Sequence, residues 1–177
     1  GGGGHHPRRL GVDEPRQLRL VLGPVDGGIG GGIDDHVGEG GVDEQLASMP
    51  GVTLATPLAN FDLAFEGTRL EATAIRGTDF AADGRLTFAA GDRAAALEAL
   101  DEGGAVILPQ GRAQRLGLGL GDVLAVVAAG GPVELKVVGI VERSFPGRTG
   151  EAVLVGWPDA EAAFGVVGAD AFAIRFA

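Results

Sequence analysis

The order of its short apolar segments is the feature that most constrains the fold of this chain. From Val42 to Ala177, runs of strand length are separated by glycine, proline and aspartate, and only a few stretches have helical periodicity. On these criteria the segment contains about eight strands and four helices. They do not alternate regularly, as the strands and helices of a doubly wound parallel sheet do. The sequence therefore predicts an α+β fold.

Turn and capping residues set the expected bounds of these elements. The predicted helices cover residues 42–51, 92–104, 110–118 and 157–165, and each ends at glycine or proline-glycine or leads into a glycine-rich turn. Strands are predicted at 52–57, 105–109, 122–129, 132–144, 151–156 and 170–177, with a hairpin over 61–77. Gly130-Gly131 predicts a second hairpin, between residues 122–129 and 132–144.

Residues 1–41 have a different texture, dominated by glycine and charge. Ordering so many glycines costs much conformational entropy, so we expect most of this segment to be mobile. Only residues 18–22 predict a short strand. We therefore divide the chain into a glycine-rich segment, 1–41, and a folded domain, 42–177.

The stretch RLGLGLGDVLAVV invites comparison with phosphate-binding loops. Its glycines, Gly117, Gly119 and Gly121, lack the G-x-G-x-x-G spacing, and a helix precedes them where a dinucleotide site requires a strand. A G-x-x-x-x-G-K-[ST] motif is absent from the sequence. We interpret these glycines and Asp122 as a structural turn that ends a helix and leads into a strand.

Charge and residue types argue against several function classes. The net charge of −10 leaves no basic footprint for nucleic acid. The chain has no cysteine, and residues 42–177 contain neither histidine nor tyrosine. Ser48 and Ser144 do not lie in G-x-S-x-G. Carboxylates at positions 62, 66, 71, 79, 92 and 142 could pair as acid and base, but a solvated acidic face is the preferred interpretation. We expect neither enzymatic activity nor a cofactor.

The strongest candidate for a metal site is the group Asp34, Asp35, His36 and Glu39. It lies in the segment expected to be mobile, whereas an ordered site needs ligands fixed by surrounding hydrogen bonds. We therefore predict no metal. A metal-dependent enzyme built on these four residues is the least favoured of the functions considered.

Loop aromatics supply the candidates for a partner-binding surface. These are Phe80, Phe88, Phe145 and Arg148, the last two in the loop SFPGRTG, where an aromatic and arginines have the composition of an interface. The alternative is core packing of the phenylalanines. Trp157 and Phe164 lie seven residues apart, and core packing is the preferred interpretation for them.

Six stretches in this order resemble a known module: MPGVTLATPLANFDLAFEG, IRGTDF, DEGGAVILPQGRAQRLGLGLGDVLAVV, GGPVELKVVGIVERS, EAVLVGWPDAEAAFG and ADAFAIRF. They resemble the MacB-like periplasmic core domain of ABC-transporter permeases of the MacB/FtsX/LolE type. Gly77–Phe80 fits the family's G.D..F segment, Gly103–Leu124 its LGL.VGD unit and Val137–Val141 its VVGIV strand. The match runs from Val42 onward and leaves residues 1–41 outside it.

The resemblance implies an integral-membrane parent permease, with this domain outside the cytoplasmic membrane between its first two transmembrane helices. The implied fold has a porter-like βαβ part and a small β-rich subdomain around the LGLGLGD corner. The implied partners are the permease's transmembrane helices, an ABC ATPase subunit that hydrolyses ATP, and an unknown extracytoplasmic substrate or protein. The family continues beyond the strand at 170–177, so we expect a fragment truncated at its C-terminal end.

An alternative remains open. The chain could be a soluble β-rich binding or assembly module that shares only the helix–GLGLGD–strand corner and has no transport role. Phe145→Ala is expected to reduce partner binding more than stability in either case.

Overall fold

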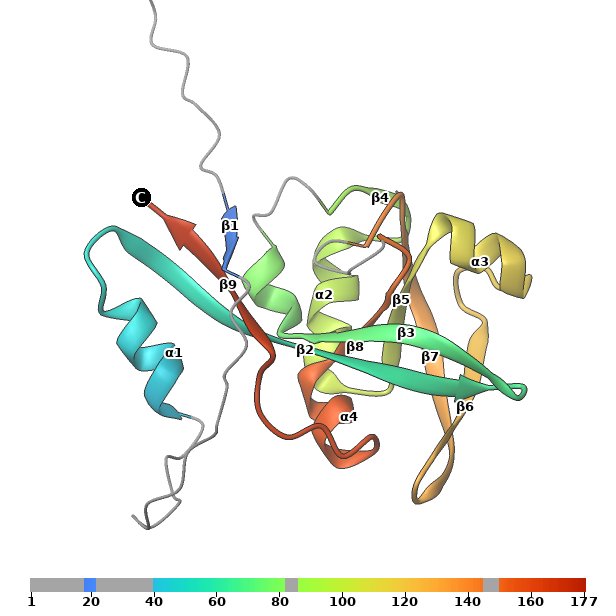
Figure 1. The fold of residues 1–177 in the computed structure, drawn as a ribbon. Helices are drawn as coiled ribbons and strands as arrows, with labels where there is room; N and C mark the ends of the chain where they lie inside the picture. The colour runs from blue at the N-terminus through green and yellow to red at the C-terminus, as the bar shows by residue number, and fades with distance from the viewer. Residues whose placement is uncertain (1–17, 22–39, 82–85, 145–149) are drawn as a thin grey trace, which may run out of the picture.

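A computed structural model describes residues 18–21, 40–81, 86–144 and 150–177, and Figure 1 shows their arrangement. The elements are β1 (Leu18–Val21), α1 (Gly40–Ala47), β2 (Val52–Phe65), β3 (Thr68–Ile75), η1 (Gly77–Phe80), β4 (Phe88–Ala90), α2 (Arg93–Glu102), β5 (Ala105–Pro109), α3 (Gln110–Leu116), β6 (Val123–Ala128), β7 (Gly131–Val141), β8 (Val153–Gly156), α4 (Trp157–Ala162) and β9 (Ala171–Phe176).

The described strands form one mixed sheet, in which β3–β8 and β5–β7 pair in parallel and the remaining pairs are antiparallel. Helices and strands do not alternate as in a doubly wound sheet, so the predicted α+β class is confirmed. The predicted helices and strands are present, with bounds displaced by a few residues. Gly77–Phe80, at the end of the predicted hairpin, form the single turn η1, and β4 was not predicted.

Six of the strands close into a small barrel. The pairing runs from β2 through β3, β8, β5, β7 and β6, and it returns to β2 where Ala64 pairs with Val127. The apolar side chains Leu63, Leu124 and Leu135 fill its interior and are fully buried. Closure removes free edges from these strands and makes the barrel a compact, interlocked unit.

A second core lies on the opposite face of the same strands. There α2 and η1 pack against β3, β5 and β8, and they bury Phe80, Leu97 and Leu100 together with Ile107 and Leu154. The strands β5 and β8 are buried on both faces, which explains their uninterrupted apolar sequences. Two cores thus share one set of strands.

The strand β2 corrects one prediction. The sequence suggested separate strands at 52–57 and from 61. In the structure β2 is continuous over 14 residues, and its first half pairs with β9 and its second half with β3. Pairing with β3 begins only at Ala59, so Pro57 has a neighbouring strand on one side, where proline is tolerated.

Polar side chains fix α2 at both ends. The Asp92 carboxylate accepts a hydrogen bond from the Ala95 amide and caps the first turn of the helix. At the other end, Asp101 accepts from the Gly77 amide and from both the amide and hydroxyl of Thr78. Arg93 donates to the carbonyl oxygens of residues 80, 81 and 86. Side chains at both ends of α2 therefore bind the backbone of η1 and of the residues that flank it.

No helix in the described residues is long and apolar enough to cross a membrane.

Candidate partner-binding surface

A groove of about 460 Å³ lies between β4 and α3, with Ile140 of β7 on its lining. Small and apolar residues line most of it, and the carboxamides of Gln110 and Gln114 supply the polar groups. These two side chains are four residues apart and therefore share one face of α3. None of the described residues that line the groove is charged. The groove therefore suits an uncharged surface of a partner.

The glycine-rich corner forms one end of this groove. Gly117 ends α3 in the left-handed conformation, with φ of 66°. The Gly119 amide donates to the Asp122 carboxylate at 2.7 Å, and the Gly121 amide donates to the Val137 carbonyl at 2.8 Å. These bonds turn the chain from α3 into β6. The residues bind backbone groups of this chain, and Gly117 and Gly119 also line the groove.

The corner glycines are expected to differ in their tolerance of alanine. Gly117 and Gly121 have φ of 66° and 89°, whereas Gly119 does not have a positive φ, and a Cβ there would lie 3.6 Å from Asp122 Oδ2, an ordinary van der Waals contact. Gly117→Ala and Gly121→Ala should each lower the free energy of unfolding by about 1–2 kcal/mol. Gly119→Ala is the matched control and should change it by less than about 0.5 kcal/mol. Urea unfolding of the three variants measures this. Equal losses at all three positions would contradict the backbone explanation.

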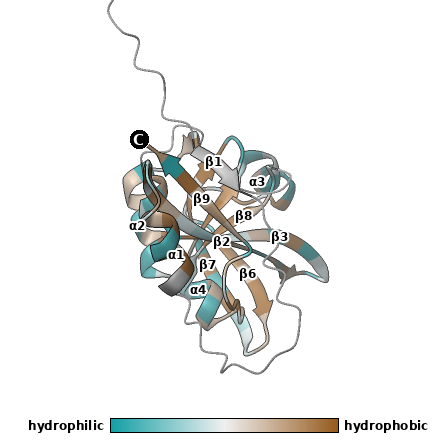
Figure 2. Ribbon diagram, turned by 60° about the vertical axis from the view of Figure 1, so that its left-hand side comes forward, coloured by the Kyte–Doolittle hydropathy of each residue, from teal (hydrophilic) through white to brown (hydrophobic). Residues whose placement is uncertain are grey.

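Several residues in the glycine-rich corner and directly after it in the sequence have exposed apolar side chains. Leu120 is 51% exposed, and Val123 and Val127 on the outer face of β6 are 48% and 61% exposed. Both faces of β6 are therefore hydrophobic, as Figure 2 shows along this strand. A solvent-facing strand normally alternates polar with apolar residues. Leu120 and this face of β6 therefore expose apolar side chains to solvent.

The predicted partner-binding residues separate into three groups. Phe80 is only 1% exposed and packs in the core between η1 and α2, so its assignment to a surface is wrong. Phe88 is half-buried: its ring lies over Gly139 and near the Arg93 guanidinium, and its strand neighbours Ala89 and Ala90 line the groove. Phe145 and Arg148 lie outside the described residues, and their role stays a prediction.

The last predicted aromatic pair packs as expected. The rings of Phe164 and Phe61 lie 5.5 Å apart between centroids, at the barrel core. The Trp157 indole N–H donates to Glu161, and the Arg76 guanidinium lies 6.0 Å from the Trp157 ring. Both side chains are held by contacts within the domain.

Several acidic residues of the described chain bind backbone amides or arginine, and no three of them lie together as a metal site would require. Asp92 and Asp101 bind amides, and Asp62 forms an ion pair with Arg69 at 3.5 Å. Within the described residues, no three acidic or histidine side chains lie close enough to bind a metal. The predicted group Asp34, Asp35, His36 and Glu39 lies outside the described residues.

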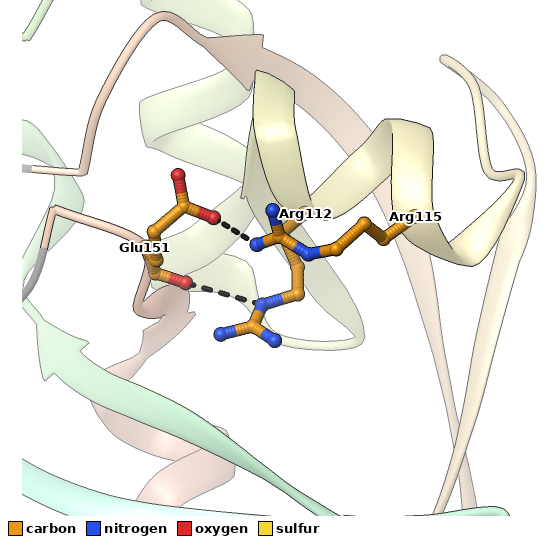
Figure 3. A network of polar contacts seen from close by, with 3 residues as sticks. All are labelled: Arg112, Arg115 and Glu151. Atoms are coloured by element: carbon orange, nitrogen blue, oxygen red, sulfur yellow. Dashed lines mark hydrogen bonds and ion pairs between the residues drawn. The ribbon is translucent and has the colours of Figure 1, made fainter.

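A polar network that the sequence did not single out lies on the other side of α3. Arg115 forms an ion pair with the Glu151 carboxylate, and Arg112 donates from Nε to the Glu151 carbonyl oxygen at 3.4 Å (Figure 3). The three-residue spacing of the two arginines places them on neighbouring positions of one helix and is the only sequence signal for this site. Glu151 lies 36 residues beyond Arg115, so sequence proximity could not identify it.

Three solved structures are similar to this chain. The extracellular domain of the noncanonic ABC-type transporter YknZ from Gram-positive bacteria matches with a TM-score of 0.54 and 18% identity, over 75% of this chain and 70% of that one. A domain of a protein described as a permease from Porphyromonas gingivalis matches with a TM-score of 0.51 and 19% identity, over 73% of this chain and 58% of that one. The periplasmic region of MacB from Actinobacillus actinomycetemcomitans matches with a TM-score of 0.50 and 12% identity, over 76% of this chain and 63% of that one. No model of a protein family and no curated protein matches the sequence.

The chain has the fold of the MacB-like periplasmic domains of ABC transporters. The predicted resemblance is therefore confirmed at the level of the fold. The chain spans less than two thirds of the length of the P. gingivalis and MacB domains, and their sequence identity to it is low. In this chain the groove is lined by residues of β4, α3 and the corner.

Proposed function

We propose that this chain is the extracytoplasmic domain of an ABC-transporter permease and relays ATP-driven conformational change to a substrate or partner outside the membrane. The observation that carries this proposal is the fold shared with extracellular or periplasmic transporter domains. In this proposal, a partner ABC ATPase hydrolyses ATP, and the permease's transmembrane helices connect that motion to this domain, which acts without catalysis of its own.

The packing of the domain supports a role in transmitting force. A relay must move as one body, because a deformable module would absorb the displacement. Here a closed barrel and a helical layer share strands that are buried on both faces. Helix α2 contacts the backbone at Gly77 and Gly156 and is fixed at its ends by Asp101 and Arg93. Densely packed interiors of this kind transmit strain.

The groove beside β4 and the predicted residues Phe88, Phe145 and Arg148 are the proposed contact region for the extracytoplasmic partner. Phe88 immediately precedes, in the sequence of β4, the two alanines that line the groove. A partner that inserts small apolar groups would bury this lining, while Gln110 and Gln114 could exchange hydrogen bonds with its backbone.

The location of the domain can be tested with a single cysteine. The chain contains none, so Glu134→Cys on the exposed side of β7 places a unique thiol in this domain. In intact cells that produce the parent protein in a cysteine-free background, a membrane-impermeant maleimide should label this thiol. A cysteine in the ATPase is the control and should react only after lysis. Protection of the Glu134→Cys thiol until lysis would reject the permease proposal.

The relay can be tested in the same background. Cross-linking between this cysteine and one in an extracytoplasmic partner should change in rate when ATP is added. It should not change when the ATPase is inactive. An extracytoplasmic domain whose cross-linking is independent of ATP hydrolysis would favour the binding-module alternative.

A further inference from the structure

We propose that Arg112, Arg115 and Arg143, grouped around Glu151, bind an acidic segment of a protein partner. We call these three residues and Glu151 the arginine surface. The inference rests on the proposed function, since it names the chemistry of the partner that this domain would contact. It concerns the side of α3 that faces Glu151 and not the groove lined by Gln110 and Gln114.

Two of the arginines come from α3 and meet the chain that precedes β8. Figure 3 shows their guanidinium groups extending from the helix toward Glu151. Arg115 contacts the carboxylate through Nη2, and Arg112 contacts the carbonyl oxygen through Nε. The Arg115 side chain nevertheless remains 56% exposed and that of Glu151 33% exposed. The ion pair is therefore open to solvent and to a competing ligand.

The third arginine approaches from the end of β7. The Ser144 amide donates to the Gly150 carbonyl at 3.0 Å, which places residues 143–144 beside residues 150–151. Side-chain carbons of Arg143 lie 3.8–4.0 Å from the position that a Cβ of Gly150 would take. Arg143 therefore lies beside Gly150, the residue that precedes Glu151. Arg143 is exposed and has no ion pair with another described residue.

The charge of this surface is opposite to that of the whole chain. Three arginines lie on the segments that meet at Glu151, and Arg115 pairs with its carboxylate, whereas the chain carries a net charge of −10. Among the described residues, no ion pair joins the neighbouring acid Glu142 to Arg143. An acidic segment would be repelled by most of the domain and attracted here, so the charge distribution would guide its position.

The geometry favours several carboxylates over a single compact anion. Glu151 already accepts hydrogen bonds from the two arginines of α3. A phosphate therefore has no free position where both guanidinium groups could bind it together. Each guanidinium has five N–H donors, and Arg112 and Arg115 each use one in the contacts with Glu151. The remaining donors can bind separate carboxylates in bidentate fashion along an extended acidic segment. Glu151 then acts as an internal competitor for Arg115.

The test measures binding of a fluorescently labelled hexaglutamate peptide to the full 177-residue chain by anisotropy, with hexaglutamine as the comparison. We expect binding of hexaglutamate alone, and weaker binding at higher salt. Arg115→Gln and Arg143→Gln should each weaken it about fivefold, the effect of one charge at contact distance in water. The matched control is Arg69→Gln, which removes an 84% exposed arginine on the β2–β3 hairpin and should leave binding unchanged.

Glu151→Gln gives the sharpest test, because its expected effect has the opposite sign. Removal of the internal competitor should strengthen hexaglutamate binding about fivefold. A purely structural ion pair would instead leave binding unchanged while lowering stability. Because Arg143 has no described ion pair, Arg143→Gln remains informative even if Glu151→Gln impairs folding.

Three results would overturn the proposal. The first is equal binding of the two peptides, and the second is an equal loss in Arg69→Gln. The third is tighter binding of inorganic phosphate or of phosphatidylglycerol vesicles than of hexaglutamate, with the same dependence on Arg115 and Arg143, which would assign the surface to phosphate groups. Because these assays use the isolated chain, they can fail independently of the cysteine-labelling test of the permease role.

Discussion

Replacing Gly156 with alanine is expected to lower the free energy of unfolding by about 3 kcal/mol or more, or to prevent folding. An alanine Cβ at this position would lie 1.8 Å from the carbonyl oxygen of Leu100 and 2.7 Å from its carbonyl carbon. These atoms belong to the backbone of α2, so rotation of a side chain cannot relieve the clash. Either the helix or the end of β8 would have to move.

Neither element is free to move. One turn earlier in α2, a Cβ at Gly77 would lie 2.1 Å from the Leu97 carbonyl oxygen, so the helix backbone is in close contact with two segments. Arg93 and Asp101 hold its two ends, and β8 is paired with both β3 and β5. Gly77→Ala is expected to be similarly destabilising for the same reason.

The matched control for Gly156 is Gly130→Ala in the turn between β6 and β7. Gly130 has no atom within 4 Å of its Cβ position and does not have a positive φ. Its replacement should change the free energy of unfolding by less than about 0.5 kcal/mol. Urea denaturation monitored by Trp157 fluorescence compares the two variants. A Gly156→Ala protein as stable as Gly130→Ala would show that the close approach of α2 to β8 is incorrect.

The local signals of the sequence were sufficient for most elements. The Asp92 cap, the left-handed Gly117 and the Gly130-Gly131 turn each depend on nearby residues, and the structure contains all three. Closure of the barrel depends instead on Ala64 meeting Val127, and no local pattern encodes such a pairing. The close contacts at Gly77 and Gly156 are equally nonlocal, which is why these glycines did not stand out.

The candidate surface was harder to predict than the fold for the same physical reason. Exposure of an aromatic side chain is decided by what packs on it, so the loop position of Phe80 was misleading. The groove depends on the distance between β4, which pairs with β7, and α3, which follows β5 in the chain. The arginine surface likewise depends on residues from three separate segments.

The correction at Phe80 leads to the second large expected effect. Phe80→Ala should lower the free energy of unfolding by about 3–5 kcal/mol, because it removes a ring from a core position that is only 1% exposed. The cavity would open between η1 and α2, where the neighbouring helix cannot collapse into it since Asp101 and Arg93 fix its ends. The Phe80 carbonyl would keep its hydrogen bond from Arg93, so the loss would report on packing alone.

Phe176→Ala is the control for Phe80→Ala, since it makes the same chemical change at a 37% exposed position near the end of β9. It should cost less than about 1.5 kcal/mol, as the ring is only partly removed from water. Urea unfolding of both variants gives the two free energies. If Phe80→Ala left stability unchanged but abolished binding to a partner, the original surface assignment would be restored. A large loss for Phe80→Ala alone would assign this aromatic residue to the core. The groove and the arginine surface would then remain the proposed places where a partner can act.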